Sequence, residues 1–276
     1  MTQRPLILIT NDDGIDSPGL HAVATAVADL GDLLIIAPST QQTGAGRSHI
    51  RIIDKAIYAV EITLPHLPFT PIPPMKTHVA YKAAVSPAQA VALGMFDLAT
   101  RPIDLCISGI NYGENVGAGI TASGTVGAAM EASLLGMPAI AMSLQTRPEL
   151  HLTHNAEIDF AAAAYFTRYF AQKVLAKGLQ PGVDLLKIDV PETATPETPW
   201  RIGRISRQSY YVPTASERTH LAEQKQLGYK IEINHDLIEP DSDIYILTYH
   251  KEVVVVPVTT DLTASVNFDQ VAEWHQ

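Results

Sequence analysis

Short apolar runs alternate with segments of helical periodicity through the first 195 residues of the chain. The runs are apolar at successive positions, which is typical of strands that helices cover on both faces of a parallel sheet. Strands are predicted at residues 6–10, 33–37, 103–107, 138–143 and 185–190. This alternation predicts an α/β fold with a Rossmann-like, doubly wound, mainly parallel sheet.

The segments between these runs carry helix start and stop signals. Ser17 and Pro18 suit the cap and the first position of a helix, and Gly31 suits its end. Further helices are predicted at residues 86–96, 125–135 and about 156–177, the last closed by Gly178.

Two parts of the chain depart from this pattern. Residues 49–81 are rich in β-formers and proline, which indicates an inserted β-rich segment. Beyond residue 195 the chain has β runs at 230–233 and 253–258 and few helical patterns. We therefore expect a catalytic core at residues 1–195 and a β-rich C-terminal extension at residues 196–276. This extension would pack on the core or on a neighbouring subunit.

Composition narrows the class of protein. The 276 residues are 46% hydrophobic and 17% charged, as in a folded globular protein, and the formal net charge of −10 disfavours a nucleic-acid polymer as partner. The single cysteine, Cys106, permits no intrachain disulfide, and no apolar run is long enough for a membrane span or signal peptide. These features predict a cytoplasmic protein without a membrane partner.

Oxygen-bearing side chains follow three of the predicted strands. Asp12 and Asp13 come after the first, Thr43 lies in the loop after the second, and Asn111 comes after residues 103–107. Ligands of open α/β sheets bind beyond these strand ends. Two adjacent carboxylates repel unless a cation or proton lies between them, and hard divalent ions prefer oxygen ligands. The pattern indicates a divalent metal site, although Asp12 and Asp13 with Gly14 also fit a turn or helix cap.

Ser123, Gly124 and Thr125 lie where the helix at 125–135 is expected to begin. Free N–H groups and the helix dipole favour an anion at such a position, and the two hydroxyls can bind phosphate oxygens. Taken alone, the same residues fit an ordinary helix cap equally well.

In this order, the polar segments resemble those of the survival protein E (SurE) nucleotidases. The matching segments are ILITNDDGIDSPGL, IIAPSTQQTGAGRS, DLCISGINYGENVG and ASGTVGAAMEASLLGMPAIAMS. The resemblance implies a Rossmann-like core, a divalent ion such as Mg²⁺, Mn²⁺ or Co²⁺, and hydrolysis of 5′- and 3′-nucleoside monophosphates. It also implies cleavage of short polyphosphate by some members, and homodimers or homotetramers that exchange C-terminal segments.

Site residues follow from the same resemblance, position by position. The implied metal ligands are Asp12, Asp13, Thr43 and Asn111, with threonine at 43 where the family more often has serine. The residues implied around the phosphate are Asn11, Asn115, Ser123, Gly124 and Thr125. Catalysis is expected from Asp12 and Asp13, with Asp13 orienting or deprotonating the attacking water. A covalent phospho-aspartate at Asp12 is the other route.

Three alternatives stay open. Signalling receiver domains also carry paired acids after their first strand, but this chain has Asn111 at the third position and no matching lysine. Phosphatases of the haloacid-dehalogenase type need Asp-x-Asp, whereas Asp12 and Asp13 are adjacent and followed by Gly14. The third alternative is a nucleotide or phosphate sensor without catalysis.

Overall fold

The computed structural model describes residues 3–49, 59–62, 78–151, 153, 157–215, 218, 220, 222–223, 228–267 and 269–270. The strands of this part of the chain are β1 (Leu6–Thr10), β2 (Asp32–Pro38), β3 (Ala59–Ile62), β4 (His78–Ala83), β5 (Leu105–Tyr112), β6 (Ala139–Leu144), β7 (Leu185–Val190), β8 (Trp200–Ile202), β9 (Tyr211–Thr214), β10 (Gly228–Ile231) and β11 (Val253–Val258). The α-helices are α1 (Pro18–Val27), α2 (Pro87–Leu93), α3 (Gly124–Leu134), α4 (Ala161–Lys177) and the single turn α5 (Asp243–Tyr245).

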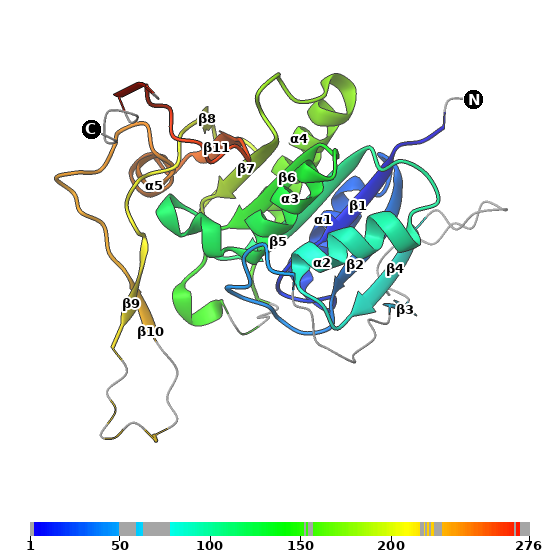
Figure 1. The fold of residues 1–276 in the computed structure, drawn as a ribbon, viewed down its shortest axis with the longest axis horizontal. Helices are drawn as coiled ribbons and strands as arrows, with labels where there is room; N and C mark the ends of the chain where they lie inside the picture. The colour runs from blue at the N-terminus through cyan, green and yellow to red at the C-terminus, as the bar shows by residue number, and fades with distance from the viewer. Residues whose placement is uncertain are drawn as a thin grey trace.

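Nine of these strands form one twisted sheet in the order β3-β4-β2-β1-β5-β6-β7-β11-β8 (Figure 1). Neighbouring strands from β4 to β7 run parallel. At the edges β3 is antiparallel to β4, and β11 is antiparallel to β7 and parallel to β8. The mainly parallel α/β sheet predicted from the sequence is thus confirmed.

Helices cover both faces of the sheet because side chains of a strand alternate between its faces. Ile7 and Ile9 of β1 belong to an apolar cluster with residues of α1 and α4. Leu8 of the same strand belongs to a second cluster, which contains residues of α3 and of the segment around α5. The central strands are therefore buried on both sides, which explains their unbroken apolar sequences.

The part of the chain after residue 195 contributes to the same sheet. β11 lies between β7 and the edge strand β8, and four of its six residues in a row, Val253 to Val256, are buried. β9 and β10 form a separate antiparallel pair that reaches away from the main sheet (Figure 1). β10, Gly228–Ile231, lies two residues earlier than the predicted run at 230–233.

Only two pieces of the proline-rich segment at 49–81 lie within the described residues beyond His49. They are β3 and the first part of β4, which pair with each other. Because β4 also pairs in parallel with β2, this end of the segment belongs to the main sheet. Residues 50–58 and 63–77 lie outside the described part of the chain.

Some predicted details were wrong. Ser17 occupies the cap position of α1, but its side chain makes no capping hydrogen bond and is buried. The strand expected at 103–107 continues to Tyr112, so Asn111 lies within β5 rather than after it. Pairing with β6 extends this strand across an irregularity between Ser108 and Asn111.

No helix of the described residues is long and apolar enough to cross a membrane.

Candidate active site

The order of the strands in the sheet reverses at β1. The strands β2 and β4 lie on one side of β1, and the chain then crosses to the other side of β1 to form β5. The carboxyl ends of two strands that diverge in this way border a crevice, where ligands of open α/β sheets bind. Asp12 and Asp13 follow β1 and Asn111 is near the end of β5, so the fold brings these predicted ligands to one crevice.

Asp12 and Asp13 are buried, with 4% and 1% of their surface exposed. Oδ1 of Asp12 accepts a hydrogen bond from the Thr125 hydroxyl at 2.6 Å. Asp13 accepts hydrogen bonds from Gln41 Nε2 at 3.1 Å and from the Tyr112 backbone N–H at 3.2 Å. All three donors are neutral, and within the described residues neither carboxylate forms an ion pair with lysine or arginine.

Burial of this pair changes its titration. Burial raises the pKa of Asp12 from 3.8 to about 6, against the lowering effect of the Thr125 hydrogen bond. Burial, together with the charge of Asp12, raises the pKa of Asp13 well above its ordinary value. Since each carboxylate disfavours the charge of the other, full ionisation of the pair requires a cation close by.

Asn111 and Thr43 are the neutral oxygens expected beside the acids. The side-chain nitrogen of Asn111 donates to the Gly113 and Tyr112 carbonyls at 2.7 and 3.3 Å, which leaves its Oδ1 to accept from a ligand. Thr43 is exposed on the loop after β2. The preceding residue, Gln42, donates its backbone N–H to the Asp12 carbonyl at 2.6 Å, so this loop is fastened to the end of β1.

The described residues contain no group of three or more His, Cys, Asp and Glu side chains arranged to hold a metal ion. A cation at Asp12 and Asp13 would therefore complete its shell with neutral oxygens and water. An all-oxygen set of two carboxylates, an amide and a hydroxyl suits a hard divalent ion such as Mg²⁺ or Mn²⁺.

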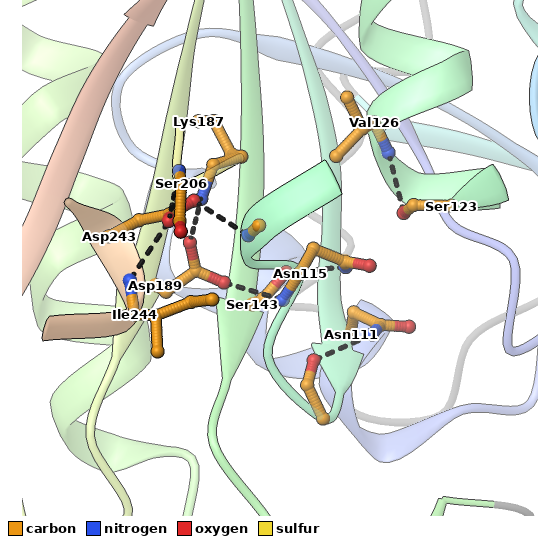
Figure 2. Close-up of polar contacts among 12 residues, drawn as sticks. Asn111, Asn115, Ser123, Val126, Ser143, Lys187, Asp189, Ser206, Asp243 and Ile244 are labelled. Atoms are coloured by element: carbon orange, nitrogen blue, oxygen red, sulfur yellow. Dashed lines mark hydrogen bonds and ion pairs between the residues drawn. The ribbon is translucent and has the colours of Figure 1, made fainter. Parts of the chain in front are cut away.

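The first turn of α3 packs directly against Asp12. A Cβ atom added to Gly124 would lie 2.6 Å from the Asp12 Cβ, so only glycine permits this approach. Ser123 caps the helix, with its Oγ accepting from the Val126 N–H at 3.1 Å (Figure 2). The cap predicted as one of two functions for Ser123 is confirmed, and the N–H groups of Gly124 and Thr125 belong to the first helical turn, where no intrahelical acceptor exists.

Asn11 and Asn115 have different surroundings. The Asn11 side chain is buried and bonds to both backbone polar groups of Gly14, each at 3.1 Å, so it fixes the turn that contains the two acids. Asn115 is partly exposed, and its Nδ2 donates to Ser143 Oγ at 2.9 Å. In Figure 2 Asn115 lies between Asn111 and a group of buried charges around Asp189.

Several residues around the site were not predicted from the sequence. Gln41 bridges the Asp13 carboxylate and the His151 carbonyl. Nδ1 of His151 in turn shares a hydrogen bond of 2.9 Å with the Tyr229 hydroxyl of β10. The His151 ring lies against Gly113. The hairpin of β9 and β10 thus contacts the segment after β6, which in turn packs on the loop after β5. Only the polar character of Gln41 in a loop next to the site was visible in the sequence.

The chain is similar to known proteins over nearly its whole length. The family model "Survival protein SurE" matches residues 7–212. A protein named 5′-nucleotidase SurE from Thermococcus kodakarensis is 37% identical over 267 residues, covering 96% of each chain. The protein of the same name from Thermococcus gammatolerans is 36% identical over 96% of this chain and 93% of its own.

A solved structure extends the similarity to the whole fold. The crystal structure of the SurE protein from Aquifex aeolicus superposes with a TM-score of 0.74 at 26% sequence identity, covering 99% of this chain and all of that one. The match includes the segments that carry Asp12, Asp13, Asn111 and the start of α3. The chain therefore belongs to the SurE family.

Proposed function

We propose that this protein is a metal-dependent 5′-nucleotidase, which hydrolyses nucleoside 5′-monophosphates to nucleoside and phosphate at the Asp12–Asp13 site. The observation that carries the proposal is the pair of adjacent buried carboxylates against the N-terminus of α3, which pairs with no lysine or arginine of the described part of the chain. The nucleotidase names of relatives that match over nearly their whole length support the same reaction.

Asp12, Asp13, Thr43 and Asn111 would hold the divalent ion. When bound, such an ion neutralises charge on the phosphate and lowers the pKa of a coordinated water. The raised pKa of both acids supports this assignment, because a cation relieves the repulsion that otherwise favours their protonation.

The protein's own residues would bind and orient the reactants. The free N–H groups at the start of α3 suit the phosphate oxygens, and charge on those oxygens increases during transfer. Asp13 would orient the attacking water and accept one of its protons at a carboxylate oxygen while the new P–O bond forms. The P–O bond to the nucleoside would break on the opposite side of the phosphorus, and the released oxygen would take a proton from solvent. Thr125 holds Asp12, and Gln41 and Tyr112 hold Asp13, which fixes both carboxylates for this task.

The proposal has three further parts. The protein would also hydrolyse 3′-nucleotides and short polyphosphate, and it would be located in the cytoplasm. It would form a homodimer or homotetramer through residues 196–276. The edge strand β8 supports the last of these, because its exposed Trp200 and Ile202 lie on an unpaired strand edge within the described residues.

A phosphate-release assay tests the reaction. We expect release from 5′-AMP with Mg²⁺, Mn²⁺ or Co²⁺, little release after chelation, and slower release from p-nitrophenyl phosphate. 3′-AMP and tripolyphosphate in the same assay test the wider substrate range. Binding of AMP without release under every metal would instead identify a sensor, and stable phosphorylation by acetyl phosphate would identify a receiver. A trapped phospho-enzyme would favour the covalent route through Asp12.

The acid pair also predicts how the metal-free protein responds to pH. Both folded-state pKa values lie above the unfolded value of 3.8, so the folded protein binds more protons than the unfolded chain above about pH 4. The free energy of unfolding should therefore fall as pH rises from 4 to 6 and beyond, by on the order of 3 kcal/mol from Asp12. We expect a higher Tm at pH 5 than at pH 7 without metal.

The double variant Asp12→Asn/Asp13→Asn is the control for this measurement. Its Tm should change less between pH 5 and pH 7 than that of the wild type, because the two titrating groups are gone. Added Mn²⁺ should raise the Tm of the wild type at pH 7 and leave that of the double variant unchanged. An identical pH response in both proteins would contradict the assignment of the effect to this pair.

A further inference from the structure

A buried ion cluster lies beside the site, formed by Lys187 and Asp189 of β7 and by Asp243 of α5. Lys187 Nζ lies 2.5 Å from Oδ2 of Asp189 and 3.2 Å from Oδ2 of Asp243. The side chains of all three residues are at most 1% exposed. Buried ion clusters contribute little net stability, because removing the charges from water offsets their attraction. Their placement therefore calls for another explanation.

The two carboxylates of the cluster hold the backbone of the loop that contains Asn115. Oδ1 of Asp189 accepts from the Asn115 N–H at 2.7 Å (Figure 2). Oδ2 of Asp243 accepts from the Gly117 N–H at 3.1 Å. The Asn115 side chain is fixed separately, by its hydrogen bond to Ser143. The loop segment is thus held at both ends by charged acceptors, whose hydrogen bonds are stronger than those of neutral groups.

The same cluster connects this loop to the C-terminal part of the chain. Oδ1 of Asp243 accepts from the N–H groups of Ser206 and Ile244 at 3.0 and 2.9 Å. A carboxylate of the segment after residue 195 therefore bonds both to its own segment and to the loop after β5. Since α3 follows this loop after one short 3₁₀ segment, Gly117–Ala122, the cluster also restrains the entry to α3.

Lys187 supplies the positive charge against which both buried carboxylates lie. Burial alone lowers the pKa of Lys187, but the two aspartates outweigh it and the net shift is upward. Burial still raises the pKa of Asp189 to about 6 despite the lysine, which shows how unfavourable this charge would be without it. The positive charge of Lys187 thus offsets the cost of burying two carboxylates, which accept hydrogen bonds from the loop.

We propose that Lys187, Asp189 and Asp243 are positioning residues for the reaction, which hold Asn115 and the loop leading to α3 in the geometry that the phosphate requires. The inference rests on the proposed function, because it takes Asn115 as a phosphate contact. It adds that the C-terminal segment takes part in catalysis through Asp243, without touching the substrate.

Variants at Asp189 test this role. Asp189→Asn keeps an oxygen that can accept from the Asn115 N–H and leaves Lys187 paired one-to-one with Asp243, whereas Asp189→Ala removes the acceptor. We expect Asp189→Ala to lower kcat for 5′-AMP about 100-fold, as a misplacement near 1 Å can, with a KM within about threefold of wild type. Asp189→Asn should keep kcat within about tenfold of the wild-type value.

Arg201→Gln is the matched control. It breaks the more exposed Arg201–Glu252 pair of the same C-terminal part and should behave as wild type.

Amide hydrogen exchange gives a readout that does not depend on activity. In folded Asp189→Ala, the amides of residues 115–117 should exchange at least about tenfold faster, while those of β1 keep their wild-type rates. Lys187→Met supplies a second variant with the same expectation in its folded fraction, together with a lower Tm from two unpaired carboxylates.

The outcomes separate the two proposals. Wild-type protein without metal-dependent release of phosphate from 5′-AMP would refute the proposed function, while the exchange data would still report on the cluster. If the wild type is active and Asp189→Ala has unchanged kcat per folded molecule and unchanged exchange at 115–117, the cluster has only a structural role and the positioning proposal is overturned.

Discussion

Replacing either acid of the central pair by asparagine, as Asp12→Asn or Asp13→Asn, should lower kcat/KM for 5′-AMP by at least about 1000-fold. Both side chains are buried at the switch point of the sheet, where neutral donors hold them. Asparagine has the same shape. At position 12 its oxygen can still accept from Thr125, and at position 13 it can accept from either Gln41 or the Tyr112 N–H, which bond to different oxygens of Asp13. The variants should therefore fold while losing the negative charge that a divalent ion requires.

Asp16→Asn is the matched control for this experiment. Asp16 lies in the same loop between β1 and α1, but it is exposed, and its replacement should leave activity within about twofold of wild type. Circular dichroism and Tm would establish that all three variants are folded. Near-normal activity of both Asp12→Asn and Asp13→Asn would eliminate the mechanism proposed above.

The second large effect is expected from Gly124→Ala. Its new methyl group would lie 2.6 Å from Cβ and 2.9 Å from Oδ2 of Asp12, closer than such atoms can approach. Either Asp12 or the first turn of α3 has to move, and both belong to the proposed site. We expect kcat to fall about 100-fold and the free energy of unfolding to fall by about 1–3 kcal/mol.

Gly119→Ala controls for the loss of a glycine in the segment just before α3. No heavy atom lies within 4 Å of the position that its Cβ would take, so activity and Tm should stay close to wild type. A Gly124→Ala protein with wild-type kcat would show that the fit between α3 and Asp12 has no bearing on the reaction.

The central strands were predictable because their physical signal is local. Residues 6–10 are apolar at four of five positions, and burial on both faces of a parallel sheet leaves that pattern in any such strand. Residues 185–190 were also assigned correctly, although Lys187 and Asp189 interrupt their apolar character. The acids after β1 were predicted to lie near Asn111 for the same reason, since the end of each parallel strand borders the same edge.

Features that depend on long-range contacts were not predictable. Ser108 and Gly109 look like the start of a loop, yet pairing with β6 continues the strand through them. The partner of Lys187 that completes its cluster, Asp243, is separated from it by more than fifty residues, so no spacing rule connects them. Ser17 was predicted to cap α1, but its hydroxyl is buried and does not bond to the first N–H groups of the helix.

The position of β11 has a consequence for how the molecule forms during translation. Because β11 lies inside the sheet, between β7 and β8, the ribosome has to deliver residue 258 before the sheet can be completed. Until then the nascent chain carries β7 with one open edge, and β8 has emerged without a neighbour to pair with. An unpaired strand edge can form backbone hydrogen bonds with other chains and so promotes aggregation. Newly made copies should thus depend on chaperones most strongly between synthesis of β7 and release of the last strand.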